Sequence, residues 1–204
     1  PSSVEAKITK NTSAVIAVHL YGHPCLMSKL SSLCDKYDLV LIEDCAQSHG
    51  ASINGKMAGS IGAISAYSFY PGKNLGGIGD GGAIVTNNEK LAKASRMISQ
   101  HGRKKNEKYV HEIVGRNSRL DTINAVVLNI KLKKLPEWLE LRNSLAKSYT
   151  SYLKDSQVKA LQVDEGVFHS YHLFVCRCED RDGLKSFLTK EDVITFWFEE
   201  ISPE

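Results

Sequence analysis

A strand–helix–strand pattern near the start of the chain constrains its fold more than any other feature of the sequence. Residues 14–20 (AVIAVHL) and 39–44 (LVLIED) are apolar runs rich in Val, Ile and Leu, as buried parallel strands are. Between the two runs, Leu26, Leu30 and Leu33 recur at the spacing of an amphipathic helix. Two strands joined by a crossover helix form a right-handed βαβ unit, so the sequence predicts an α/β fold with a mostly parallel sheet.

A lysine lies between the next two β-prone runs, 63–70 and 82–86. The first run ends in a Pro-Gly turn, Lys73 follows, and a glycine-dense loop leads into the second run. The segment is no P-loop, because Tyr67 replaces its first glycine and Asn74 its Ser or Thr. The glycines precede a strand instead of opening a helix, which excludes the dinucleotide fingerprint. Lys73 is therefore either a solvated turn residue or a desolvated amine that acts as a nucleophile or Schiff-base partner.

An acid at the end of the 39–44 run favours the second interpretation. Asp44 closes this run, and the carboxyl ends of parallel strands are where α/β proteins bind ligands. Pyridoxal phosphate needs a lysine for its aldehyde and an acid for its pyridinium nitrogen. Because an acid ends one strand and a lysine follows the next, the pair Asp44 and Lys73 predicts a pyridoxal phosphate site.

Four strings in order along the chain extend this prediction to a family. The chain closely resembles the DegT/DnrJ/EryC1/StrS sugar aminotransferases in VHLYG (18–22), IEDCAQSHGA (42–51), SFYPGKNLGGIGDGGAIVT (68–86) and GRNSRLDTINAVVLNIKL (115–132). The resemblance covers about residues 12–190. It implies part of a fold-type-I aminotransferase: a three-layer large domain with a mostly parallel sheet, followed by part of a smaller α+β domain.

The resemblance implies a role for five residues of this chain. Lys73 would be the Schiff-base lysine, and Asp44 would be the partner of the pyridinium nitrogen. Gln47 would lie against the ring of pyridoxal phosphate, and Ser68 would bind its phosphate. Asn117 would reach the phosphate bound by a neighbouring subunit, which implies a homodimer in the complete protein.

The resemblance also implies the reaction, which is transfer of an amino group from an amino acid, with glutamate as the expected donor, to a keto carbon of a nucleotide-linked sugar. Asp44 would keep the ring nitrogen protonated, and Lys73 would move the proton that leaves the α-carbon. A related dehydratase that uses pyridoxamine phosphate carries histidine in place of this lysine. Lys73 therefore favours the transaminase branch.

The ends of the sequence differ from those of complete family members. The N-terminal part of the large domain is not in the sequence, and the chain departs from the family pattern after residue 192. We therefore expect an internal fragment of the family. Three alternatives stay open for its function: a truncated aminotransferase, one half of a split enzyme, and a non-catalytic or regulatory module.

Composition excludes several other classes of protein. A formal net charge of +3 is too small to indicate a nucleic-acid partner. No apolar stretch approaches the roughly 18 residues of a membrane span, so we expect no membrane partner. The five cysteines form no Cys-x-x-Cys pair, and their odd number argues against a disulfide framework. We therefore expect a cytoplasmic protein with reduced thiols and no metal.

A proline marks the expected boundary between two domains. A strongly helical run begins at Asp121 or Thr122, and Pro136 is expected to end it. We therefore predict a partial cofactor-binding large domain over 1–136, and a linking helix with a truncated small domain over 137–204.

One long strand, 168–178, is predicted in the small domain. His169 and His172 would point to opposite faces of that strand because they are three residues apart, so they are not expected to form a metal pair.

Overall fold

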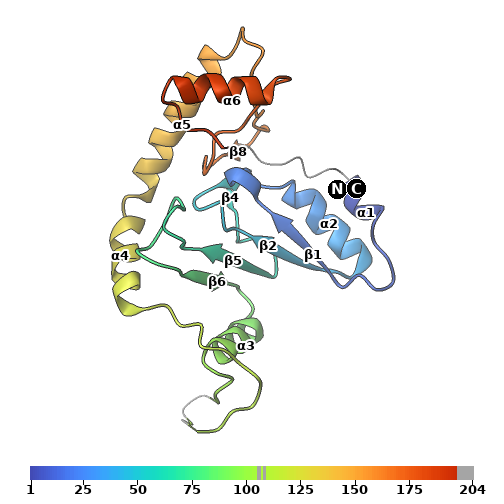
Figure 1. Ribbon diagram of the computed structural model, residues 1–204. Helices are drawn as coiled ribbons and strands as arrows, with labels where there is room; N and C mark the ends of the chain where they lie inside the picture. Colours follow the sequence, from blue (N-terminus) through green and yellow to red (C-terminus); the bar gives the residue numbers. More distant parts are fainter. Residues whose placement is uncertain (105–106, 108, 197–204) are drawn as a thin grey trace.

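The computed structural model describes residues 1–104, 107 and 109–196, and its centre is a four-stranded sheet (Figure 1). The strands are β1 (Ala14–Val18), β2 (Val40–Asp44), β5 (Ile64–Ser68) and β6 (Gly82–Val85), in that order across the sheet. The first three strands are parallel, and β6 pairs antiparallel with β5 at one edge. This arrangement confirms the predicted α/β fold with a mostly parallel sheet.

Helix α2 (Met27–Tyr37) connects β1 to β2, as the sequence predicts, and packs on one face of the sheet. Its apolar side chains meet the inward-facing residues of the strands in one buried cluster. The buried members of this cluster are Ala17, Met27, Leu30, Cys34, Leu41 and Ile53. Burial of these side chains is the main source of stability for this layer, at ~25 cal/mol for each Å² of apolar surface removed from water.

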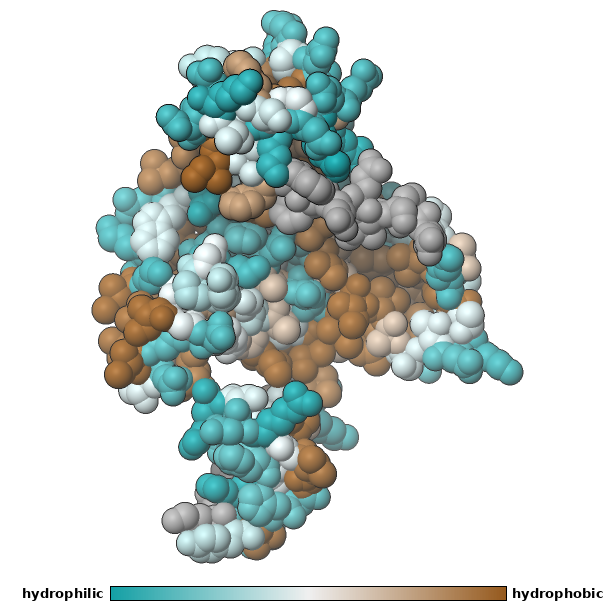
Figure 2. All heavy atoms as spheres, viewed as in Figure 1, coloured by the Kyte–Doolittle hydropathy of each residue, from teal (hydrophilic) through white to brown (hydrophobic). Residues whose placement is uncertain are grey.

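The opposite face of the sheet is apolar and exposed among the described residues. Alternation along the strands places Ile16, Val18, Val40 and Ile84 on this face. Their side chains are between 46% and 63% exposed. Figure 2 shows apolar side chains gathered over the part of the molecule that holds the sheet. We call this surface the open face. Polar side chains of the same strands also lie on this face, and they belong to the candidate site.

Helix α3 (Glu89–Ser99) follows β6 and leads into a long excursion. Asn88 caps the helix, because its side-chain oxygen accepts hydrogen bonds from the Lys90 and Leu91 N–H groups at 2.9 and 3.2 Å. The described part of the excursion, up to residue 118, folds back as an irregular loop with two isolated bridges. Figure 1 shows α3 and this excursion projecting away from the sheet.

Two helices, α4 (Thr122–Leu132) and α5 (Leu135–Tyr152), follow the excursion. The prediction that Pro136 ends the first of these helices is wrong. The first helix ends at Leu132, and Pro136 lies in the first turn of the second, where the missing N–H of proline costs nothing. Figure 1 shows both helices along one side of the molecule, from the sheet to the C-terminal part. Among the described helices, none combines the length and apolar character that crossing a membrane requires.

Short elements make up much of the rest of the described chain. They are α1 (Ser2–Glu5), the 3₁₀ helix η1 (Leu20–Gly22), β3 (Ser52–Ile53), β4 (Lys56–Met57), β7 (Lys159–Ala160), β8 (Val167–Phe168), β9 (Cys176–Arg177) and α6 (Arg181–Lys190). Strand β8 pairs with β3, so the C-terminal part contacts the N-terminal part directly. The division at residue 136 stays a prediction, and residues 197–204 of the predicted small domain lie outside the described residues.

The predicted strand over 168–178 is wrong. Only its two ends are extended, in β8 and β9, and the residues between them form a turn. Tyr171 has a φ of +42°, which a strand does not allow, and its ring stacks on the ring of His169 at 4.0 Å. His169 and His172 therefore do not alternate on a strand. We call residues 169–172 the histidine turn.

Candidate functional site

Asp44 and Ser68 lie on the open face at the carboxyl ends of two neighbouring parallel strands. Asp44 ends β2 and pairs in register with Ala66 of β5, and Ser68 follows two residues later on the same side of β5. The Asp44 Oδ1 atom accepts a hydrogen bond from the Ala46 N–H at 2.9 Å, and the Ser68 hydroxyl accepts one from the Tyr70 N–H at 3.3 Å. Both side chains are half-buried, so a ligand on this face could contact them.

Lys73 lies on a turn that begins where β5 ends. Its N–H donates to the Tyr70 carbonyl at 2.9 Å, which closes the turn, and its side chain is half-buried. The Lys73 amine makes no hydrogen bond or ion pair with any residue that the structure describes. Two residues later, Leu75 is buried in an apolar cluster with Leu128, Leu135 and Leu139. The lysine is thus on a fixed loop, with its amine available for chemistry.

Helix α4 explains the glycines that follow Lys73. A Cβ atom on Gly77 would clash with the Asn124 Oδ1 atom, so only glycine fits so close to the helix. The same Asn124 oxygen accepts a hydrogen bond from the Ile78 N–H at 3.1 Å. Lys131, further along α4, donates to the Gly76 carbonyl at 2.5 Å. The glycine-dense loop is therefore built for close packing against α4.

Gln47 and Asn117 end up in very different places. Gln47 follows β2 closely, and its side-chain oxygen accepts a hydrogen bond from the Tyr21 N–H at 2.5 Å. Asn117 is exposed on the excursion after α3, where its side chain accepts a hydrogen bond from Arg119 at 3.1 Å. The fold brings Asp44, Gln47, Ser68 and Lys73 to one end of the sheet, and does not bring Asn117 to them. The roles of all five residues stay predictions.

Two histidines that the sequence did not assign to the site lie near Lys73. Burial, together with the charges of His172 and Lys73, lowers the pKa of His49 to about 4. Burial, together with the charges of Lys73 and Arg142, lowers the pKa of His172 to about 4. Both imidazoles are therefore neutral at neutral pH and stand within the electrostatic reach of the Lys73 amine. No sequence pattern indicates His172, because its position depends on the histidine turn.

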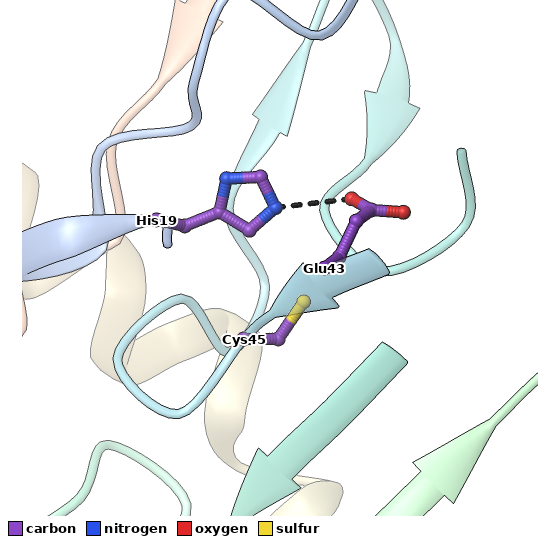
Figure 3. Close-up of side chains that lie close together, drawn as sticks. All are labelled: His19, Glu43 and Cys45. Carbon is purple, nitrogen blue, oxygen red and sulfur yellow. Dashed lines mark hydrogen bonds and ion pairs between the residues drawn. The ribbon is translucent and has the colours of Figure 1, made fainter. Parts of the chain in front are cut away.

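A second cluster of polar side chains lies behind the site, under α2. His19, Glu43 and Cys45 are fully buried, and one ligand atom from each lies within 4.8 Å of the others. Figure 3 shows the His19 ring, at the end of β1, pointing at the Glu43 carboxylate on β2, with the Cys45 sulfur beside them. The distance between His19 Nε2 and Glu43 Oε2 is 3.0 Å. Imidazole, carboxylate and thiolate groups are all metal ligands in other proteins.

Hydrogen bonds explain this trio without a metal. The Cys25 N–H donates to His19 Nδ1 at 3.0 Å, so His19 is the neutral tautomer whose Nε2–H donates to Glu43. Backbone N–H groups supply the other donors to the carboxylate, and they belong to Gly59, Ile61 and Gly62, at 2.8, 2.8 and 2.5 Å. Both carboxylate oxygens accept two hydrogen bonds each. Glu43 is therefore a structural acid, although it is next to Asp44 in the sequence.

The chain is similar over most of its length to proteins that are already known. The chain is 44% identical over 196 residues to the erythromycin biosynthesis sensory transduction protein EryC1 of Saccharopolyspora erythraea, covering 96% of this chain and 53% of that protein. It is also 44% identical to the dTDP-3-amino-3,4,6-trideoxy-α-D-glucose transaminase of Streptomyces venezuelae, covering 96% of this chain and 51% of that protein. The chain thus spans about half the length of the curated relatives it matches.

A solved structure shows the same fold. The crystal structure of S. venezuelae DesV in complex with a ketimine intermediate superposes with a TM-score of 0.90 at 43% identity, over 94% of this chain and 51% of that chain. The profile of the DegT/DnrJ/EryC1/StrS aminotransferase family matches residues 1–202. The structural likeness confirms the fold-type-I aminotransferase fold, and the profile covers nearly the whole sequence. The chain belongs to the DegT/DnrJ/EryC1/StrS aminotransferase family.

Proposed function

We propose that the protein transfers an amino group to a keto carbon of a nucleotide-linked sugar, with pyridoxal phosphate as cofactor. The observation that carries the proposal is the placement of an acid, a hydroxyl and a lysine at one end of the sheet. Asp44 and Ser68 share the open face, and the amine of Lys73, on the turn that follows β5, has no partner among the described residues. Membership of the aminotransferase family supports the same function, since pyridoxal phosphate is the cofactor of that family.

These residues fit the chemical groups of pyridoxal phosphate. Lys73 would bind the aldehyde covalently, and Asp44 would hold a proton on the pyridine nitrogen. The second carboxylate oxygen of Asp44 has no hydrogen-bond donor among the described residues, which leaves it for that nitrogen. The Ser68 hydroxyl would donate to the phosphate, and Gln47 would lie against the ring. Asn117 would act on the neighbouring subunit of a homodimer.

The residues of the chain divide the proton transfers between them. When bound, the cofactor supplies a conjugated ring that accepts electrons from the substrate α-carbon. Asp44 would hold the proton on the ring nitrogen, which makes the ring a better electron acceptor. The Lys73 amine would take the proton from the α-carbon of the donor amino acid, and it would deliver a proton to the sugar carbon that receives the amino group. The neutral imidazoles of His49 and His172 add no positive charge near this amine at neutral pH.

The substrate proposal uses the names of the relatives. The transaminase of S. venezuelae is named for a dTDP-linked 3-amino sugar. A transaminase of Aneurinibacillus thermoaerophilus, 41% identical over 203 residues, is named for dTDP-3-amino-3,6-dideoxy-α-D-galactopyranose. We therefore propose a nucleotide-linked 3-keto sugar as the amino acceptor and glutamate as the donor.

Trapping of the cofactor tests the proposal. The purified protein is incubated with pyridoxal phosphate, reduced with borohydride, digested and mapped by mass spectrometry. We expect the phosphopyridoxyl group on Lys73, its loss in Lys73→Ala, and its retention in the control Lys56→Ala, which removes an exposed lysine. A dTDP-linked 3-keto sugar and glutamate should then give an aminated sugar. Label spread evenly over surface lysines, or no aminated product, would contradict the proposal.

A second candidate function is regulation. It is favoured by one observation: the relative from S. erythraea is named a sensory transduction protein. A regulatory protein of this fold would bind pyridoxal phosphate on Lys73 but would form no aminated sugar. The two readouts of the trapping experiment therefore separate the two candidates.

A further inference from the structure

The histidine turn is embedded in the part of the molecule that carries the site. Ser170, at its centre, is fully buried. The Ser170 N–H donates to the Gly22 carbonyl at 3.0 Å, and the Leu173 N–H donates to the Tyr21 carbonyl at 3.3 Å. On the outer side, Arg142 of α5 donates to the Tyr171 carbonyl at 2.8 Å. The turn is thus held from two sides, although it comes about a hundred residues after Lys73 in the sequence.

The residue after Lys73 is bonded to this turn. The Asn74 side chain is only 7% exposed, and its Nδ2 donates to the Ser170 carbonyl at 2.8 Å. The next residue, Leu75, is buried against α4 and α5. Two consecutive residues after the lysine are therefore anchored, one by a buried hydrogen bond and one by apolar packing. This leaves the backbone of Lys73 little freedom to move relative to the histidine turn.

The same turn also contacts the loop that carries Gln47. The Ser170 hydroxyl lies 3.3 Å from the Gln47 carbonyl and 3.4 Å from the Gly22 carbonyl, so it can donate to either. Gly22 has a φ of +98°, and a Cβ atom there would clash with the Ser170 hydroxyl oxygen. The Gln47 side chain in turn holds the Tyr21 N–H. Ser170 thus joins the loop of Lys73 to the loop of Gln47 through direct contacts.

Building on the proposed function, we infer that Asn74 and Ser170 are positioning residues. Through them the histidine turn of the C-terminal part fixes the distance between the Lys73 amine and the Gln47 loop. Neither residue needs to touch the cofactor. The lowered pKa of His172 agrees with this inference, because the charge of Lys73 reaches the turn. The C-terminal part would therefore help to position Lys73, in addition to packing against the part of the chain that holds the sheet.

A matched pair of substitutions separates positioning from stability. Asn74 and Asn143 both donate a side-chain N–H to the histidine turn, to the Ser170 carbonyl at 2.8 Å and the His169 carbonyl at 3.0 Å. Only Asn74 is next to Lys73. Asn74→Ala and Asn143→Ala should both lower the urea concentration at which half of the protein is unfolded, because each leaves a buried carbonyl without its donor. Only Asn74→Ala should change the chemistry at Lys73.

Two readouts at Lys73 complete the experiment, both on variants shown to be folded by circular dichroism. The first is the pyridoxal phosphate concentration that half-saturates borohydride trapping on Lys73; we expect Asn74→Ala to raise it about tenfold and Asn143→Ala to leave it unchanged. The second is the rate of Lys73 acetylation by acetic anhydride, relative to Lys56, which needs no cofactor. It should change severalfold in Asn74→Ala alone.

The outcomes keep the two proposals apart. Trapping absent from the unsubstituted protein would overturn the proposed function, and acetylation would still decide the positioning role. Equal Lys73 acetylation rates in Asn74→Ala and Asn143→Ala would overturn the positioning role of Asn74. As a second check, Ser170→Ala should shift both readouts in the same direction as Asn74→Ala. A Ser170→Ala protein that behaves like the unsubstituted protein would remove Ser170 from the inference.

Discussion

Glutamine in place of Glu43 should destabilise the protein severely. The carboxylate accepts two hydrogen bonds on each oxygen, from His19 and Gly59 on one, and from Ile61 and Gly62 on the other. In either orientation, the NH₂ group of glutamine would face two donors that have lost their acceptor. A buried donor without an acceptor costs about 1–3 kcal/mol, so we expect Glu43→Gln to lower the free energy of unfolding by about 2–6 kcal/mol.

The contribution of Glu43 should also depend on pH. Burial alone would raise the pKa of this carboxyl group, but the hydrogen bonds from His19 and the three backbone N–H groups hold it below its usual value. The folded state therefore releases the proton more readily than the unfolded state. The stabilisation is complete above the usual pKa of glutamate, about 4.3, and is lost as the pH falls through the lower folded-state value.

Urea unfolding followed by far-ultraviolet circular dichroism measures both effects. The control is Glu89→Gln, which removes the same charge from an 81% exposed side chain paired with Lys93 at the surface of α3. This control should change the free energy of unfolding by less than about 1 kcal/mol. At pH 7 the free energies of unfolding of Glu43→Gln and Glu89→Gln should differ by several times that value. The difference should be smaller at pH 3. Equal losses for the two variants at pH 7 would refute the argument from hydrogen-bond geometry.

Three further predictions concern the site, the core and the pH range. Asp44→Asn should leave trapping of pyridoxal phosphate on Lys73 in place but slow amino transfer by about 10²–10⁴-fold, measured as aminated sugar formed per minute; joint loss of trapping would indicate a damaged fold. Leu41→Ala should lower the free energy of unfolding by about 2–5 kcal/mol because Leu41 is buried, whereas Ile84→Ala on the open face should cost much less in the same urea titration. Stability should fall between pH 6.5 and about 4, because the pKa values of His49, His169 and His172 are all lowered to about 4 and the unfolded chain takes up these protons first. His169→Asn retains an acceptor for the Tyr171 N–H and should make that part of the profile less steep; an unchanged slope would exclude His169 as one of its sources.

The parts of the site that the sequence could predict are those fixed by local patterns. Alternation and strand ends are local properties, so the apolar runs of β2 and β5 are enough to place Asp44 and Ser68 at one edge of the sheet. A proline predicts a helix boundary less reliably, because it can follow the end of one helix or lie in the first turn of the next. Pro136 does the second.

The histidine turn could not be predicted because its conformation depends on distant partners. Tyr171 adopts its positive φ while its carbonyl accepts from Arg142 of α5 and the preceding carbonyl accepts from Asn74. The β-prone composition of residues 168–178 indicates a strand, and these tertiary contacts override that tendency. The position of His172 near Lys73 follows from the same contacts, which is why spacing along the sequence did not reveal it.

The neighbouring acids of β2 should behave differently in any large-scale mutational survey. Because they face opposite sides of one strand, substitutions at Glu43 should deplete the folded protein in cells, whereas substitutions at Asp44 should leave its abundance nearly intact. A screen that scores only growth or product would give the two positions the same value. A parallel screen for abundance would separate them, and the ratio of the two scores along β2 should alternate residue by residue from one face of the strand to the other.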